Sequence, residues 1–356
     1  MRKILPGLMA VVALIACGER IAEHRATFYV FGTLLEIQIR DKDRALAQRA
    51  TTELSEQFQR MHREWHAWEP GGELSRLNTA LASGETLTVG PFLLPLVHKA
   101  REYYRLSGGL FDPAVGALVA AWGFHADEPP KGAPPLERVR ELHARKPTMA
   151  DVVIEGERVS SRNPAVRLDF GGFAKGVALD YALAHLRSLG ISNALLNAGG
   201  GLAALGSHGE RPWVAAIRDP RKDGVLAVVT LFSGDALHTS GGYERFREHE
   251  GRRYTHIIDP RTGMTAERMI SASVIHEDGG LADAAATALM LTTPQTWEAL
   301  TKDMGIRLAL LVDANGEIYL TPEMRERLKW ENVPPTLHIG KPWDERVGCG
   351  ATSAAS

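Results

Sequence analysis

The chain has 356 residues, with 41 Lys and Arg against 43 Asp and Glu and a formal net charge of −2. This balance gives no strong electrostatic case for nucleic-acid binding, so no nucleic-acid partner is expected. A charged fraction of 24% and an apolar fraction of 44% are typical of a globular protein with one large domain or two ordinary ones.

The N-terminus resembles a bacterial lipoprotein signal peptide over residues 1–16. Arg2 and Lys3 precede a mostly apolar run, Ile4–Ala16, that is shorter than a typical transmembrane helix. The run ends in Leu-Ile-Ala-Cys17, which resembles a lipobox, and Cys17 would then be lipidated. A plain signal peptide or an N-terminal anchor is the alternative. We expect a lipid anchor on the periplasmic side of a bacterial membrane, with the outer membrane favoured because residue 18 is Gly rather than Asp.

The first elements after a predicted tether at residues 17–25 are two strands and a helix. Ala26–Arg40 alternates apolar and polar residues over its second half, and Gly32 marks a bend, which predicts a hairpin. Arg44–Trp65 has the spacing and the residue types of a helix.

Two tryptophans, Trp65 and Trp68, precede a breaker cluster at Glu69–Gly72 and a short helical turn at Glu73–Asn78. A tryptophan in this position either belongs to the core or stacks on a planar ligand ring. The sequence leaves both possibilities open for Trp65 and for Trp68.

A helix is predicted over Phe92–Ser107, and two glycines end it. Asp112 and Pro113 then occupy the N-cap and N1 positions of a second helix that runs to about Trp122. Capping accounts for Asp112 without any ligand, although a helix N-terminus entered through Gly-Gly is also an anion site.

Residues 126–147 are rich in proline and predict a loop with a short helix, and Asp151–Arg162 predicts a hairpin. Further strands are predicted at Asn193–Ala198, Trp213–Ile217, Val225–Phe232, Ala236–Thr239 and Ile270–His276, and a final α–β unit at Gln295–Leu320 precedes a polar tail.

A glycine-rich turn follows the strand that begins at Val166 and precedes a helix over Val177–Leu189. Its glycines would let the backbone approach a ligand closely, and Lys175 near the helix start can reach a phosphate. The spacing is neither that of a Walker A loop nor GxGxxG. A purely structural turn is the equal alternative.

The stretch Tyr254–Gly263 predicts a strand that runs into a tight turn. It carries an imidazole, a carboxylate and a guanidinium, at His256, Asp259 and Arg261. Side chains on a rigid turn at a strand end are often functional. A surface hairpin with ordinary polar residues is the alternative.

The helix predicted over Leu281–Leu291 carries Asp283 and Thr287 four residues apart, and therefore on one face. With backbone carbonyls from a glycine loop, these side chains make an oxygen-only set that suits Mg²⁺ rather than Zn²⁺. The alternative for Asp283 is stabilisation of the helix dipole. No His/Cys cluster with zinc spacing occurs in the sequence.

Taken together, these segments resemble the ApbE family of FAD:protein FMN transferases. The motifs that carry the resemblance are Phe31-Gly-Thr33, Glu73-Leu-Ser-Arg-Leu-Asn78, Gly108-Gly-Leu-Phe-Asp-Pro113, Leu168-Asp-Phe-Gly-Gly-Phe-Ala-Lys-Gly176, Asn197-Ala-Gly-Gly200, Thr239-Ser-Gly-Gly-Tyr243, His256-Ile-Ile-Asp-Pro-Arg-Thr-Gly263 and Ala282-Asp-Ala-Ala-Ala-Thr287. Each motif is weak alone, but their number and order make the resemblance specific.

The resemblance implies the fold and the site. The fold would be α/β (α+β), a single ApbE-like domain of mixed sheets with flanking helices over residues 26–340, followed by a flexible tail at residues 341–356. The residues placed at the FAD site would be Phe31, Trp68, Leu110, Phe111, Asp112, Asp169, Lys175, His256, Ile257 and Ala286. The carbonyl of Gly172 and the side chains of Asp283 and Thr287 would hold Mg²⁺.

The reaction implied by the resemblance is phosphoryl transfer. A Thr or Ser hydroxyl of an acceptor protein, expected to be a membrane redox-complex subunit, would attack the FMN phosphorus of FAD, and AMP would leave. Either Asp283 or His256 would be the catalytic base. The alternatives are a Mg²⁺-dependent FAD pyrophosphatase that gives FMN and AMP, or a lipid-anchored protein that binds FAD without catalysis.

Three features depart from the family pattern or extend it. Phe31 stands where Met is usual, and Gly242 stands where Asp or Asn is common. The tail segment Gly350–Ala354 is similar to the core of flavinylated acceptor segments, which makes self-flavinylation at Thr352 a hypothesis beside a disordered tail.

Overall fold

The computed structural model describes residues 23–41, 43–126, 128, 131–334 and 336–343. The predictions for the signal peptide, for Cys17 and for Thr352 lie outside these residues. Among the helices of this part of the chain, none is long and apolar enough to cross a membrane.

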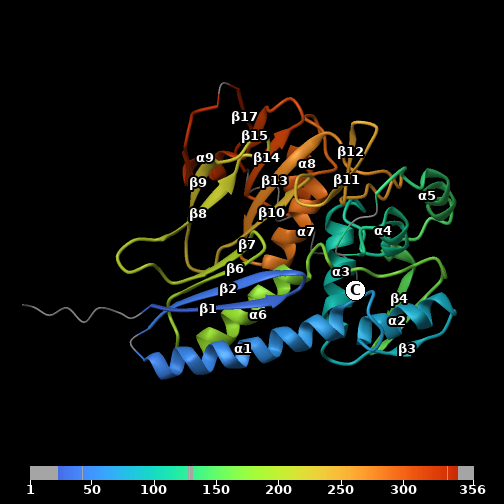
Figure 1. Ribbon diagram of the computed structural model, residues 1–356, viewed down its shortest axis with the longest axis horizontal. Coiled ribbons are helices and arrows are strands. Elements are labelled where there is room, and N and C mark those ends of the chain that lie inside the picture. Colours follow the sequence, from blue (N-terminus) through green and yellow to red (C-terminus); the bar gives the residue numbers. More distant parts are fainter. Residues whose placement is uncertain (1–22, 42, 127, 129–130, 335, 344–356) are drawn as a thin grey trace, which may run out of the picture.

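A nine-stranded sheet runs through the molecule in the order β1-β2-β6-β7-β10-β13-β14-β15-β17 (Figure 1). Its neighbouring strands are antiparallel except for β15 and β17. The strands are β1 Glu23–Val30, β2 Thr33–Arg40, β6 Ala194–Ala198, β7 Gly201–Leu205, β10 Ala236–Gly241, β13 Met269–His276, β14 Leu308–Asp313, β15 Ile318–Leu320 and β17 Leu337–Ile339.

Three smaller sheets surround the large one. They consist of β3 Leu87–Thr88, β5 Arg158–Ser161 and β4 Val152–Glu155; of β16 Leu328–Trp330, β9 Val225–Leu231 and β8 Trp213–Arg218; and of the hairpin β11 Phe246–His249 and β12 Arg252–Thr255. The helices are α1 Arg44–Trp65, α2 Glu73–Ala82, α3 Leu94–Leu106, α4 Gly116–Trp122, α5 Leu136–His143, α6 Ala174–Ser188, α7 Gly279–Leu289, α8 Trp297–Asp303 and α9 Pro322–Arg327, with a 3₁₀ turn at Met149–Asp151.

The two faces of the large sheet belong to different cores, because successive side chains of a strand point to opposite faces. Val274 of β13 packs in the larger core with residues of α1, α6 and α7. The next residue, Ile275, packs in the second core with residues of β8 and β9. Helix α7 therefore lies against the face of the sheet that carries the larger core (Figure 1).

Helix α7 is held at its N-terminal end by α6. A Cβ atom added at Gly176 would lie 2.1 Å from the carbonyl oxygen of Gly279, so only glycine permits this approach of the two helices. The Asp180 carboxylate accepts hydrogen bonds from the backbone N–H groups of Gly279 and Gly280, at 2.9 and 3.2 Å. These bonds satisfy donors that a helix N-terminus leaves free.

Most predicted elements are confirmed, but several boundaries are not. Strand β1 begins at Glu23, inside the stretch predicted as a tether. Helix α4 begins at Gly116 rather than Pro113, and α6 begins at Ala174, so that Lys175 is helical. A helix and two strands follow Leu320 where a polar tail was predicted; β16 and β17 form by pairing with strands remote in sequence, which local patterns do not show.

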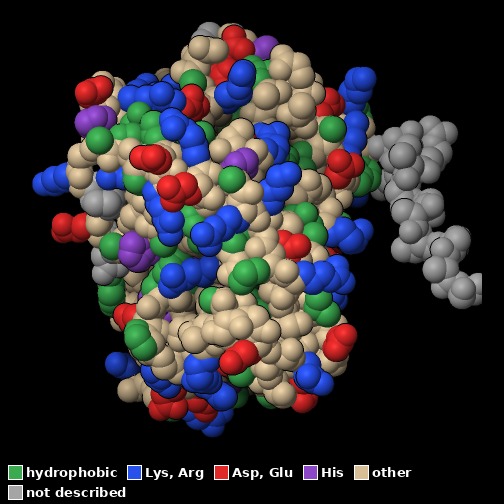
Figure 2. All heavy atoms as spheres, turned by 90° about the vertical axis from the view of Figure 1, so that its right-hand side faces the viewer, with side chains coloured by type: hydrophobic (Ala, Val, Ile, Leu, Met, Phe, Trp, Pro, Cys, Tyr) green, Lys and Arg blue, Asp and Glu red, His purple; other side chains and the backbone are tan. Residues whose placement is uncertain are grey.

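The face of the molecule that carries α4 and α5 is polar. Lys and Arg side chains are spread across it with Asp and Glu interspersed, and small apolar patches lie between them (Figure 2). This mixture of signs agrees with the balanced composition of the chain.

Candidate active site

A cavity of about 410 Å³, the main cavity, brings together segments from all parts of the domain. The predicted site residues that line it are Phe31, Leu110, Phe111, Asp112, Asp169, Gly172, Lys175, His256, Ile257, Asp283 and Thr287. Its walls come from the turn between β1 and β2, the loop before α4, the glycine turn before α6, the segment after β12, and α7.

Two predicted site residues are not in this lining. Trp68 lines a separate cavity of about 610 Å³, where the Arg167 guanidinium lies 4.0 Å from the centre of its indole ring. That cation–π contact covers one face of the indole ring. Ala286 is completely buried in the larger core, because it lies on the inner side of α7 beside Thr287.

Phe31 supplies an aromatic wall from a strained turn. It has a left-handed backbone with φ of 55°, and Gly32 follows with φ of 70°, as a two-residue hairpin turn of the I′ type requires. The ring packs edge-on against Phe58 and His62, with centroid distances of 6.3 and 5.9 Å. These contacts fix an apolar surface where the family pattern has Met.

Asp283 and Thr287 lie on the face of α7 that lines the main cavity. The Asp283 side chain is buried, and its Oδ2 atom has no hydrogen-bond partner among the described residues. Burial opposes ionisation of this carboxyl, but the charge of Lys175 and the neighbouring His238 outweigh it and hold its pKa below the ordinary value. The Thr287 hydroxyl donates to the Asp283 carbonyl oxygen at 3.2 Å.

The glycine turn before α6 lies against these two residues. A Cβ atom added at Gly172 would be 3.7 Å from Thr287 Oγ1 and 3.0 Å from the Phe111 ring, so the backbone of Gly172 comes close to both. Lys175 Nζ donates to the Gly171 carbonyl oxygen at 3.3 Å, and Asp169 Oδ1 accepts from the Gly171 N–H at 2.9 Å. Burial raises the pKa of Asp169.

The residues around Asp283 fit a hard divalent cation. A buried carboxylate oxygen without a partner is unfavourable unless a cation or water satisfies it. The Thr287 hydroxyl adds a second oxygen, the backbone of Gly172 lies close by, and oxygen-only sets suit Mg²⁺. Within the described ranges there is no group of three or more His, Cys, Asp or Glu side chains that could hold a metal.

His256 is a neutral imidazole in the cavity wall. Its Nδ1 lies 3.1 Å from the Arg245 carbonyl oxygen, which can only accept, so Nδ1 carries the proton. The second ring nitrogen, Nε2, therefore has a free lone pair. Burial, together with the positive charges of Arg245 and Lys175, lowers the pKa of His256 to about 4.

Asp112 holds the backbone rather than capping a helix. Its Oδ1 accepts hydrogen bonds from Ala114 N at 2.9 Å and Met149 N at 3.1 Å, and burial raises its pKa to about 6. The predicted N-cap role is wrong, because α4 starts four residues later, at Gly116. The carboxyl still borders the main cavity.

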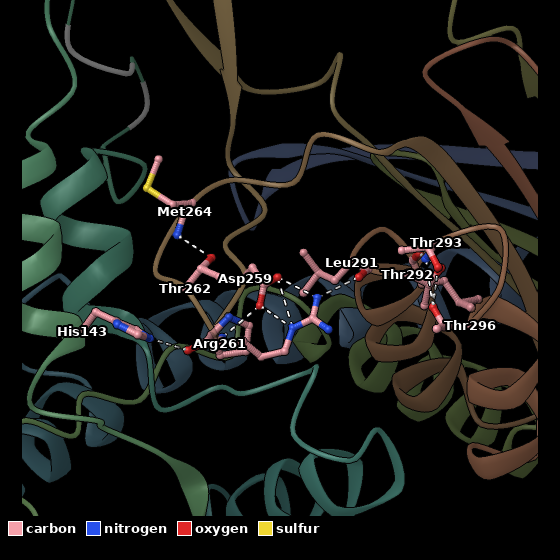
Figure 3. Close-up of polar contacts among 11 residues, drawn as sticks. His143, Asp259, Arg261, Thr262, Met264, Leu291, Thr292, Thr293 and Thr296 are labelled. Atoms are coloured by element: carbon pink, nitrogen blue, oxygen red, sulfur yellow. Dashed lines mark hydrogen bonds and ion pairs between the residues drawn. The ribbon is translucent and has the colours of Figure 1, made fainter.

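The carboxylate and guanidinium of the Tyr254–Gly263 stretch satisfy each other instead of facing the cavity. Arg261 Nη2 lies 2.7 Å from Asp259 Oδ2 and donates to the Leu291 carbonyl oxygen at 3.0 Å, just beyond the C-terminal end of α7 (Figure 3). On the other side of the turn, the His143 ring contacts the Pro260 carbonyl oxygen at 3.2 Å. Only His256, Ile257 and Ile258 of the stretch line the cavity.

Sequence reasoning missed several lining residues with polar side chains, among them His238, Ser240, Glu244 and Arg245. Alternation along β10 was the available signal, since residues 236, 238 and 240 point to one face of the sheet. The unusual Gly242 is explained by packing: a Cβ there would lie 2.8 Å from the Thr255 methyl group.

Comparison with known proteins agrees with this site. A family model described as the ApbE family matches residues 31–311. The chain belongs to the ApbE family. It is 50% identical over 303 residues to a FAD:protein FMN transferase of Rhodobacter capsulatus. The aligned region covers 85% of this chain and 58% of the relative, so the chain spans little more than half of that protein. It is 30% identical over 318 residues to the FAD:protein FMN transferase of Vibrio cholerae, covering 88% of this chain and 94% of the relative.

Solved ApbE structures share the fold. The ApbE protein of Thermotoga maritima superimposes with a TM-score of 0.79 at 29% identity, over 86% of this chain and 99% of that one. The flavin transferase ApbE of Vibrio cholerae gives a TM-score of 0.76 at 26% identity, with the same coverage. The predicted family and the predicted α/β (α+β) fold are thus confirmed.

Proposed function

We propose that this protein transfers FMN from FAD to a Thr or Ser hydroxyl of an acceptor protein and releases AMP. The observation that carries the proposal is the meeting of Asp283, Lys175 and His256 in one cavity, as an ionised carboxylate with a free oxygen, an ammonium group and a neutral imidazole. The printed names of the ApbE relatives support it.

In the proposed reaction the acceptor oxygen attacks the phosphorus of the FMN half of FAD. A new P–O bond forms as the bond from that phosphorus to the bridging oxygen breaks, and AMP leaves with the electron pair. The hydroxyl proton passes to a base. We assign this role to Nε2 of His256, whose tautomer leaves a lone pair there, whereas the Asp283 carboxylate would bind the cation.

The remaining groups would bind and orient FAD. Phe31, Leu110, Phe111 and Ile257 offer apolar surface for the flavin ring, and Lys175 offers a positive charge for the pyrophosphate. Gly172, Asp283 and Thr287 would hold Mg²⁺, which when bound supplies charge neutralisation of the pyrophosphate and of the transition state.

The test uses the full chain in detergent with FAD, Mg²⁺ and a Thr-containing acceptor domain, and records the intact mass of the acceptor. A gain of one FMN that depends on Mg²⁺ and is lost in Asp283→Ala supports the transferase. Free FMN and AMP without a gain would indicate the pyrophosphatase instead. Intact FAD that stays bound would indicate a flavin-binding protein.

The lipid anchor is part of the same proposal. Lipidation at Cys17 would place the enzyme on the periplasmic side of the membrane, beside acceptor subunits of membrane redox complexes. Incorporation of labelled palmitate into the wild type, but not into Cys17→Ser, would support it. Equal labelling of both proteins would contradict it.

A further inference from the structure

Strand β10 contacts helix α7 through two polar pairs at the cation site. His238 and Ser240 are two residues apart on β10, and Asp283 and Thr287 are four residues apart on α7. These spacings correspond to about 6 to 7 Å in each element, so the pairs match in register. His238 Nδ1 lies 3.5 Å from Asp283 Oδ1, and Ser240 Oγ lies 3.1 Å from Thr287 Oγ1.

The position of His238 is built for an imidazole. The side chain is 2% exposed, and a Cβ atom added at the neighbouring Gly201 would lie 2.5 Å from its Cε1 atom. Gly201 of β7 therefore leaves the space that the ring fills. His238 buries two polar nitrogens, and Nε2 has no hydrogen-bond partner among the described residues. An apolar side chain at this position would avoid that cost, so packing alone does not account for a histidine.

The Asp283 carboxylate shows the complementary pattern. Its Oδ1 atom faces the imidazole, whereas its Oδ2 atom is buried without a hydrogen-bond partner in the part of the chain that the structure describes. One oxygen thus has a polar protein neighbour at 3.5 Å, and the other has none among the described residues. Carboxylates that bind metals are commonly oriented in this way by a second group behind them.

We propose that His238 is a positioning residue for the cation site, which holds Asp283 through Nδ1–H and Oδ1 so that Oδ2 is presented to a divalent cation. Ser240 does the same for Thr287, because the Thr287 hydroxyl already donates to the Asp283 carbonyl and so accepts the Ser240 hydrogen. This inference rests on the proposed function only for the existence of a cation site.

The chain offers matched variants for the test. In His238→Asn the amide nitrogen can take the place of Nδ1, in His238→Gln it takes the place of Nε2, and His238→Leu fills the space without a polar atom. The measurement is Mn²⁺ binding to the full chain without FAD, monitored through the EPR signal of free Mn²⁺. Melting temperatures establish that each variant is folded.

We expect His238→Asn to bind Mn²⁺ within about 3-fold of the wild type, and the Gln and Leu variants to bind roughly 10- to 100-fold more weakly. Ser240→Ala should show a smaller loss. If the Leu variant fails to fold, the contrast between Asn and Gln still decides the question.

Three outcomes would overturn the inference: equal Mn²⁺ affinity in all His238 variants, no saturable Mn²⁺ binding by the wild type, or a nitrogen directly bound to Mn²⁺ in pulsed EPR. If all His238 variants bind Mn²⁺ equally but Asp283→Asn does not bind it, His238 has no role at the cation site and the proposed function is unaffected. If the FMN-transfer test fails while the His238 variants still differ in Mn²⁺ affinity as expected, the proposed function is wrong and the inference about His238 stands.

Discussion

The Tyr254–Gly263 stretch and helix α7 each present a carboxylate close to groups that suggest chemistry, but only one of the two carboxylates is left for a ligand. Asp259 is paired with Arg261, which also ties the turn to Leu291 (Figure 3). Asp283 is buried with one oxygen unpartnered. Unsatisfied hydrogen-bonding capacity, rather than the density of charged residues, therefore distinguishes the candidate ligand-binding carboxylate from the structural one.

The largest effect is expected where the free carboxylate is removed. Asp283→Asn keeps the shape of the side chain but loses the charge that binds a cation, so FMN transfer should fall by about 10³-fold or more. The rate of FMN incorporation into an acceptor at saturating Mg²⁺ measures this. The matched control is Asp259→Asn, whose transfer rate should stay within about 10-fold of the wild type because Asp259 pairs with Arg261 in a structural turn. Equal losses of transfer rate in both variants would show that Asp259 and Asp283 do not differ in function.

His256 is the one polar side chain of the stretch that faces the cavity, and its removal ranks second. His256→Gln should lower the rate of transfer by roughly 10²- to 10⁴-fold, as is usual for loss of a general base. The pH profile gives a second measurement. Only the neutral ring accepts a proton, so with a pKa of about 4 the wild-type rate should fall only as pH drops through about 4. A decline centred near the ordinary histidine pKa would argue against this assignment.

Arg261 should matter for stability more than for chemistry. Arg261→Ala removes the hydrogen bond to Leu291 and leaves Asp259 without its partner, so the free energy of unfolding should fall by about 1 kcal/mol. Urea unfolding measures it, and transfer activity should drop less than 10-fold. As a control, Arg138→Ala breaks an exposed pair with Glu141 and should change stability by less than about 0.5 kcal/mol. A large loss of activity at unchanged stability would place Arg261 in the chemistry after all.

The smallest effect concerns Asp180, the carboxylate that holds the N-terminal end of α7. Burial and the charge of Asp278 raise its pKa to about 6, above the ordinary 3.8. The folded protein therefore keeps a proton that the unfolded chain releases between these values, and the stability this contributes is present below pH about 4 and lost as pH rises through about 6.

Asp180→Asn should flatten this part of the stability profile, measured as the melting temperature between pH 4 and pH 7. Asp223→Asn, at a fully exposed side chain, should reproduce the wild-type profile. An unchanged profile in Asp180→Asn would show that this carboxyl does not titrate in the window.

Patterns confined to one element were predicted well. Alternation predicted the β1–β2 hairpin, and helical spacing predicted α1 and the common face of Asp283 and Thr287. Features that depend on remote partners were not predicted. Asp112 was interpreted as an N-cap because Met149, which donates to it, is 37 residues away, and the stacking partner of Trp68 is Arg167.

The order of the motifs was enough to identify the family. The sequence also showed which polar side chains share a helix face or a turn, because side-chain identity and the periods of helix and strand are local properties. Only the tertiary structure decided which of these groups is satisfied and which is free. Asp259 and Asp283 look alike in a sequence, but their partners come from segments that folding brings together. Hydrogen bonding and burial are therefore non-local properties, and they decide which carboxylate is left to bind a ligand.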